Sequence, residues 1–287
     1  MNLFYFLTTI VGYVFYASQN ETSVLRSTAV QQNMSAVNST VDLLILGAGW
    51  TSTFLIPLCK ERNISYATTS RSGANDTIKF EFDQAEEDSD IFKPLPDAKT
   101  VLITFPITLS GGSERLVRLY KSTRHNSDTN PAFIQLGATS IWGTSDRSIA
   151  RAAAESGSQA PIPPKPKELQ WFDRHSPLNP GDRGAAETEL LALAPAMPTT
   201  VLDLAGLWGG TRSMKNYSSI HMIHGIDVAR AILAVHANFS KASGERWLLT
   251  DGRVYDWWDL ASAWGSGSDS RNRIVKTVDH KQHGYAS

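Results

Sequence analysis

The sequence lacks the features that several common classes of protein require. It has one cysteine, Cys59, among 287 residues, which excludes an internal disulfide framework. Its formal net charge is −1, so it has no basic excess of the kind that nucleic-acid-binding domains use. We therefore expect no nucleic-acid partner. His221, His224 and Asp227 do not supply the closed set of nitrogen and sulfur ligands of a zinc site, and we expect no metal.

A hydrophobic run long enough to cross a membrane is also missing. Residues 3–16 are apolar and aromatic, but a spanning helix needs about 20 such residues. The run is similar to the core of a signal peptide, although no Lys or Arg precedes it. Residues 3–18 are interpreted as a signal peptide or short membrane anchor, or else as a non-native start or a disordered extension. Localisation therefore stays open between the cytoplasm, which suits the remaining chain, and the secretory route.

The most informative stretch that is present is residues 41–55. Four consecutive apolar residues, 43–46, predict a strand buried on both faces. Glycine at the next position permits a tight turn, and the missing Cβ at Gly49 lets a pyrophosphate approach the backbone. A plain strand–turn–helix corner is the alternative. The candidate cofactor-binding residues here are Gly47, Gly49, Trp50, Thr51 and Ser52.

The end of the second predicted strand, residues 64–69, indicates which dinucleotide would bind. A carboxylate there would bind the ribose 2′-hydroxyl of NAD, and none is present. Ser70 and Arg71 follow instead, and a hydroxyl with a guanidinium suits a 2′-phosphate. We therefore favour NADP over NAD as the cofactor. The alternative is that Arg71 is an ordinary solvated loop residue.

Apolar segments with strand and helix patterns alternate along the chain as far as residue 205. This alternation predicts right-handed βαβ units and a parallel sheet. The strand at 100–105 ends in three further cofactor-contact candidates, Thr104, Phe105 and Pro106. The other predicted strands are 79–82, 132–136, 199–204 and 246–250, and the predicted helices are 50–62, 113–121, 181–193 and 257–264.

Two details of the predicted helices can be checked. Pro57 lies inside the helix at 50–62 and predicts a kink or an early end. A later helix has Asp227 as its expected cap. We expect a proline-rich loop at 144–170. The predicted division is a hydrophobic leader and linker (1–40), an NAD(P)-binding domain (41–205), a small C-terminal lobe (206–264) and a flexible tail (265–287).

Several segments taken in order resemble one family, the extended short-chain dehydrogenase/reductases, and in particular their atypical, epimerase/dehydratase-like members. The resemblance covers about residues 42–264 and implies an α/β fold: a Rossmann-type doubly wound parallel sheet with a small C-terminal α/β lobe on the substrate side. The matching segments are Gly47-Ala48-Gly49, 139–143 (TSIWG, like S-x-VYG), 171–177 (WFDRHSP, like E-x-S/T-P), 204–210 (LAGLWGG, like R-x-x-x-x-YGP) and 224–229 (HGIDVA, like V-x-D-x-A).

The chain departs from this family at the catalytic residues. The family uses a Tyr and a Lys four positions later as acid and base, supported by a Ser or Thr. Here the corresponding helix has Arg183 and Glu187, and the Ser position is Ala138. Spacing of i, i+4 favours a simple ion pair, so a structural role competes with a catalytic one. The candidate catalytic residues are Ser140, Thr139 and Arg183.

Two hypotheses about function follow. The resemblance implies an NAD(P)-dependent oxidoreductase or epimerase-like enzyme that acts on an unknown small molecule. The missing Tyr and Lys favour a non-catalytic dinucleotide-binding regulator or scaffold. Few residues separate 204–210 from 224–229, so the substrate is small or its pocket incomplete. A homodimer is among the expected assemblies.

Overall fold

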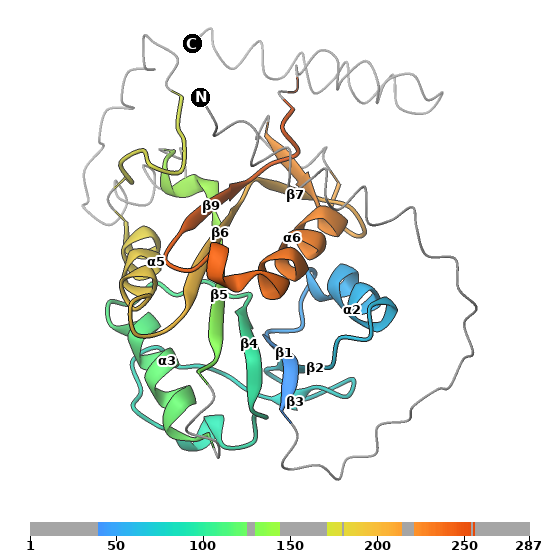
Figure 1. Ribbon diagram of the computed structural model, residues 1–287, viewed down its shortest axis with the longest axis vertical. Helices are drawn as coiled ribbons and strands as arrows, with labels where there is room; N and C mark the ends of the chain where they lie inside the picture. Colours follow the sequence, from blue (N-terminus) through green and yellow to red (C-terminus); the bar gives the residue numbers. More distant parts are fainter. Residues whose placement is uncertain are drawn as a thin grey trace, which may run out of the picture.

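The computed structural model describes residues 40–124, 130–143, 171–179, 181–213, 221–253 and Tyr255. The expected leader, most of the linker, the loop at 144–170, the helix at 257–264 and the tail lie outside these residues. A central sheet is covered by helices on both faces (Figure 1). None of the described helices has the length and apolar content that a membrane crossing requires.

The described strands and helices alternate, as the sequence predicts. The main sheet contains β1 (Val41–Leu46), β2 (Tyr66–Ser70), β3 (Ile78–Lys79), β4 (Ala98–Ile103), β5 (Ala132–Ala138), β6 (Thr199–Leu204) and β9 (Arg246–Leu249). The main helices are α2 (Ser52–Glu61), α3 (Gly112–Ser122), α5 (Asp182–Ala192) and α6 (Gly225–Ala237). Short 3-10 turns cover Asp90–Phe92, Thr139–Ile141 (η2) and Phe239–Lys241.

The sheet is parallel throughout, in the order β3-β2-β1-β4-β5-β6-β9. The chain builds outward from β1 to β3 and then returns to place β4 on the other side of β1. The predicted α/β Rossmann fold is therefore confirmed. In such sheets ligands bind beyond the carboxyl ends of the strands where the order reverses, which here is between β1 and β4.

The two sides of β1 bury different cores, because successive side chains of a strand point to opposite faces. Leu44 and Leu46 pack in the cluster that includes α3 and α5, whereas Leu43 and Ile45 pack in the cluster of α2 and α6. All four have no exposed surface. The prediction that this strand is buried on both faces is confirmed.

Three local predictions are wrong. The early end expected at Pro57 does not occur, because the helix continues to Glu61; Thr53, whose carbonyl loses its donor to proline, lies on the exposed side of the helix. The cap of α6 is His224, whose side chain accepts a hydrogen bond from the Ile226 amide at 3.2 Å. Asp227 instead pairs with Arg230 on the helix surface. The third strand is Ile78–Lys79, not 79–82.

The C-terminal region contributes to two sheets. β9 pairs with β6 in the main sheet, and α6 packs against α2. β7 (Gly206–Trp208) and β8 (Met222–His224) form a separate two-stranded parallel sheet. The sequence did not predict these two short strands. They follow the end of β6 (Figure 1) and bring Gly209 next to the glycine corner, where its carbonyl accepts a hydrogen bond from Trp50.

Candidate functional site

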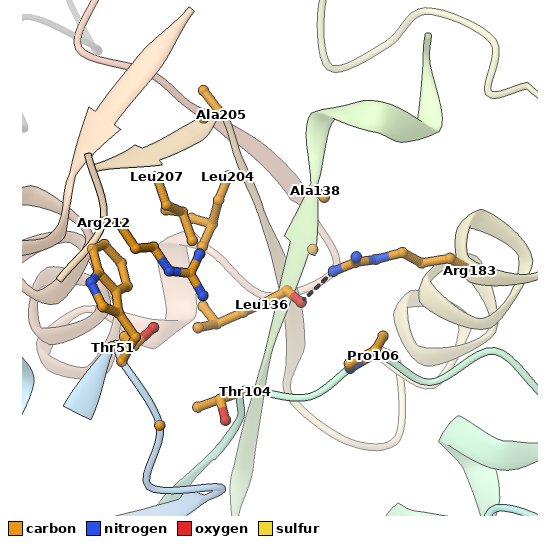
Figure 2. A pocket seen from close by; sticks show the side chains of 14 residues that line it. Thr51, Thr104, Pro106, Leu136, Ala138, Arg183, Leu204, Ala205, Leu207 and Arg212 are labelled. Carbon is orange, nitrogen blue, oxygen red and sulfur yellow. Dashed lines mark hydrogen bonds between the residues drawn. The ribbon is translucent and has the colours of Figure 1, made fainter. Parts of the chain in front are cut away.

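A pocket of about 430 Å³ opens at the carboxyl ends of the central strands (Figure 2). Its position is the one that the reversal of strand order predicts for a ligand. The lining residues come from four places in the chain: 49–51 after β1, Thr104 and Pro106 after β4, 136–138 of β5 with Arg183 of α5, and 204–207 with Arg212.

Gly47 makes the sharp turn out of β1. Its φ is +97°, a conformation that residues with a Cβ rarely adopt. A Cβ at this position would lie 2.5 Å from the Thr104 Oγ1. That hydroxyl donates to the Gly47 carbonyl at 2.8 Å, and the Gly47 amide donates to the Thr69 Oγ1 at 3.0 Å. Neighbouring strands thus hold the turn on both sides.

Gly49 and the two amides after it form an open cradle. No atom lies within 4 Å of the place where a Cβ of Gly49 would be. Among the described residues, the backbone N–H groups of Trp50 and Thr51 find no acceptor. Unpaired amides at the start of a helix favour an anion. The geometry of this corner therefore fits a diphosphate.

The side chain of Trp50 forms a wall of the pocket and does not fill it. Its Nε1 donates to the Gly209 carbonyl at 3.0 Å, and its ring packs edge-on against Phe54 at 4.9 Å. The guanidinium of Arg212 lies 4.7 Å from the centre of the Trp50 ring. Reciprocal backbone hydrogen bonds between Gly209 and Arg212 fix the turn that carries this arginine. The sequence analysis missed Arg212.

A buried cluster of charged groups lies beneath the other end of the pocket. Arg183 donates from Nε to Glu187 at 3.0 Å and from Nη2 to the Leu136 carbonyl at 3.1 Å. Arg246 of β9 donates from one nitrogen to Glu187 at 2.7 Å and to Asp203 of β6 at 2.8 Å. The expected ion pair on α5 is therefore present, and it belongs to a network that joins α5, β6 and β9.

Burial shifts the pKa of Asp203 in this cluster. The Asp203 side chain has no exposed surface. The pKa of Asp203 rises from an ordinary 3.8 to about 7. Loss of hydration is the main cause, the nearby Glu187 also raises the pKa, and Arg246 acts in the opposite direction. Asp203 therefore binds its proton much more tightly in the folded protein than in the unfolded chain.

The predicted site residues divide into three groups. Gly49, Trp50, Thr51, Thr104, Pro106 and Arg183 line the pocket. Gly47 and Ser52 shape the glycine corner, and Phe105 packs against the core. Ser70 and Arg71 lie at the end of β2, whereas Thr139 and Ser140 lie in η2 and are not among the lining residues described.

Of the comparisons with known proteins, the one with solved structures supports the fold. No family model and no curated protein matches this sequence. The solved structures of a UDP-N-acetylglucosamine 4-epimerase from Bacillus cereus and of RMD from Pseudomonas aeruginosa complexed with NADPH do match. Each is 14% identical, with 79% of this chain covered; the TM-scores are 0.53 and 0.50, and 84% and 81% of those chains are covered.

A third structure, MoeE5 in complex with UDP-glucose and NAD, is 13% identical with a TM-score of 0.52, and the match covers 77% of this chain and 80% of that one. These likenesses show the fold alone. The chain has the fold of extended short-chain dehydrogenase/reductases of the epimerase/dehydratase kind, as its sequence motifs suggested.

Proposed function

We propose that this chain binds a nicotinamide dinucleotide and uses it in oxidoreductase or epimerase-like chemistry on a small molecule. The observation that carries the proposal is the cradle at Gly49, where open space meets the unpaired amides of Trp50 and Thr51. It lies at the reversal of strand order, where the fold binds dinucleotides. Similar structures hold NAD or NADPH.

The order of the strands supports a placement of the two halves of the ligand. The half of the sheet with β1, β2 and β3 would take the adenosine, and the half with β4, β5 and β6 the nicotinamide. The diphosphate would lie between them on the amides of the helix, with the guanidinium of Arg212 on its other side. Charge-assisted hydrogen bonds from both walls would then hold it.

Arg183 is the catalytic candidate that lines the pocket. A bound nicotinamide would supply or accept the hydride. The guanidinium of Arg183 would donate hydrogen bonds to the substrate and hold it in position toward the nicotinamide. We assign no step to Thr139 and Ser140, because their side chains are not among the lining groups described.

One observation favours the second candidate function, a non-catalytic dinucleotide-binding regulator. The described lining includes no Tyr, His, Lys, Asp or Glu, so no lining side chain has an ordinary pKa suited to proton transfer at neutral pH. Purified protein with NADPH and a panel of aldehydes, ketones and nucleotide sugars separates the two candidates. Turnover that Arg183→Gln abolishes supports the enzyme, whereas binding without any turnover supports the regulator.

Gly49→Ala tests the cradle directly. The new methyl group would meet no protein atom, so the melting temperature should stay the same, but it would occupy the space that the diphosphate needs. We expect the Kd for NADPH to rise roughly 30-fold, since about 2 kcal/mol of hydrogen bonding to a charged group is lost.

The measurement is a fluorescence titration with NADPH and with NADH. Gly143→Ala is the control, since its site is exposed, also open and outside the pocket, and its Kd should equal that of the wild type. Wild-type protein that binds neither nucleotide at millimolar concentration would refute the proposed function.

Arg71→Gln tests the preference for NADP. Arg71 is exposed at the end of β2, and no carboxylate among the described residues pairs with it. The Kd for NADPH should rise roughly 10-fold or more, as expected for the loss of a charge-assisted bond to phosphate, with no change for NADH. Arg62→Gln, at another exposed arginine, is the matched control. Equal effects on both nucleotides would show that Arg71 does not bind the 2′-phosphate.

A further inference from the structure

The charge in the pocket is all of one sign. Among the described residues that line it, Arg183 and Arg212 carry positive charge, and none carries negative charge. Figure 2 shows the two arginines on opposite sides of β5, with Arg212 on the side of Thr51 and Arg183 reaching in from α5. A dinucleotide diphosphate would occupy the Thr51 side, which leaves the second arginine without an anion.

We propose that Arg183 binds a carboxylate group of the small substrate. The proposal rests on the proposed function, because it assigns the dinucleotide to the rest of the pocket. It names the substrate class: a small molecule that carries a carboxylate next to the group that reacts with the nicotinamide. Arginine suits this role because its planar fork matches the two oxygens of a carboxylate.

The structure holds Arg183 in place without using up its hydrogen-bonding capacity. A guanidinium has five N–H donors. Two of them are engaged, one with Glu187 and one with the Leu136 carbonyl. The remaining three, including both on Nη1, have no partner among the described residues. The side chain is 31% exposed, so these donors can be reached from the pocket.

The carboxylate that pairs with Arg183, that of Glu187, also pairs with a second arginine. Glu187 also accepts a hydrogen bond from Arg246 at 2.7 Å, so one carboxyl group faces two guanidinium groups. Asp203 faces Arg246, and its raised pKa, which burial causes, lowers its negative charge below about pH 7. Arg183 therefore keeps an excess of positive charge in a partly buried setting, where an incoming anion is attracted more strongly than in water.

The neighbouring walls favour a small anion with an apolar body. On the Arg183 side the lining comes from β5, through Ala138 and the Leu136 carbonyl that accepts from Arg183, whereas Leu204 and Leu207 lie with Arg212 on the other side of the strand (Figure 2). No second cation among the described lining residues lies on the Arg183 side. Three free donors can satisfy one carboxylate but would leave oxygens of a phosphate group unpaired. The geometry thus favours a carboxylate over a second phosphate.

The test uses the full chain and matched pairs of probes. Pyruvate and acetate are compared with their neutral amides, pyruvamide and acetamide, and with inorganic phosphate. Binding is followed by isothermal titration calorimetry, both with saturating NADPH and without nucleotide. NADPH binding itself is measured first, so a failure of the proposed function is seen separately from a failure of carboxylate binding.

We expect the acids to bind at least 10-fold more tightly than the amides and than phosphate. Arg183→Gln should remove that preference and leave the Kd for NADPH unchanged, while Arg183→Lys should retain part of it. Arg174→Gln, at an arginine paired with Glu245 outside the pocket, is the control. Equal binding of acids and amides to wild-type protein, a preference for phosphate, or an unchanged preference in Arg183→Gln would overturn the proposal.

Discussion

Replacing Gly137 with alanine should lower the free energy of unfolding by at least about 3 kcal/mol, the sum expected for overpacking a core and disturbing a buried ion pair. A Cβ at this position would lie 2.1 Å from the Asp203 Oδ1 and 2.9 Å from the Glu187 Oε1. Both side chains are buried and bound to Arg246. They cannot move aside without breaking bonds to that arginine.

Urea denaturation of the variant and of Gly143→Ala measures this effect. Gly143 is exposed, and no atom lies within 4 Å of its missing Cβ, so the control should unfold like the wild type. The backbone of Gly137 does not require glycine, because its φ lies outside the left-handed region. A stable Gly137→Ala variant would mean that the two carboxyl groups do not lie against β5 as described.

Replacing Arg246 with methionine should cost about 3–5 kcal/mol of stability at pH 8, because removal of one partner leaves a buried charge uncompensated. Asp203 would lose the only cation that binds it among the described residues. The matched control is Arg174→Met. Arg174 and Glu245 form a partly exposed ion pair at 2.8 Å, and such pairs contribute about 1 kcal/mol or less.

The effect should depend on pH with a definite sign. The folded-state pKa of Asp203 is about 7, above the ordinary 3.8, so between these values the folded protein binds more protons than the unfolded chain. The contribution of Asp203 to the free energy of unfolding is therefore fully present below about pH 4 and is lost as the pH rises through 7. Without Arg246 the pKa would rise further. The loss in Arg246→Met should be larger at pH 8 than at pH 5, and a loss that is independent of pH would contradict this account.

The part of the site that sequence could predict is local. The glycine corner lies within one strand, one turn and one helix, so the residue types at 43–52 determine both its shape and its open cradle. The pair Arg183 and Glu187 is also local, since four positions on a helix bring two side chains together. The parallel sheet followed from the alternation of strands and helices, which restricts the topology.

The rest of the site depends on contacts between distant segments. The Trp50 indole meets the Gly209 carbonyl across 159 positions of sequence, and this contact, with the turn at Gly209, brings Arg212 to the pocket. In the sequence, Arg246 is simply a charged residue at the start of an expected strand. Its role becomes visible only in the structure, where β9 pairs with β6. Neither arginine lies in a pattern that marks a site. β7 and β8, of three residues each, also depend on a contact between distant segments and were not predicted from the sequence.

The position of Arg246 in β9 has a consequence for how the protein is made. A ribosome synthesises this arginine 59 residues after Glu187 and 43 residues after Asp203. Until β9 emerges, a nascent chain that has completed β6 holds an aspartate for which no guanidinium has yet been supplied. We therefore expect the β6 edge of the sheet to close late, after translation of β9, and nascent chains that stop short of it to remain sensitive to proteases.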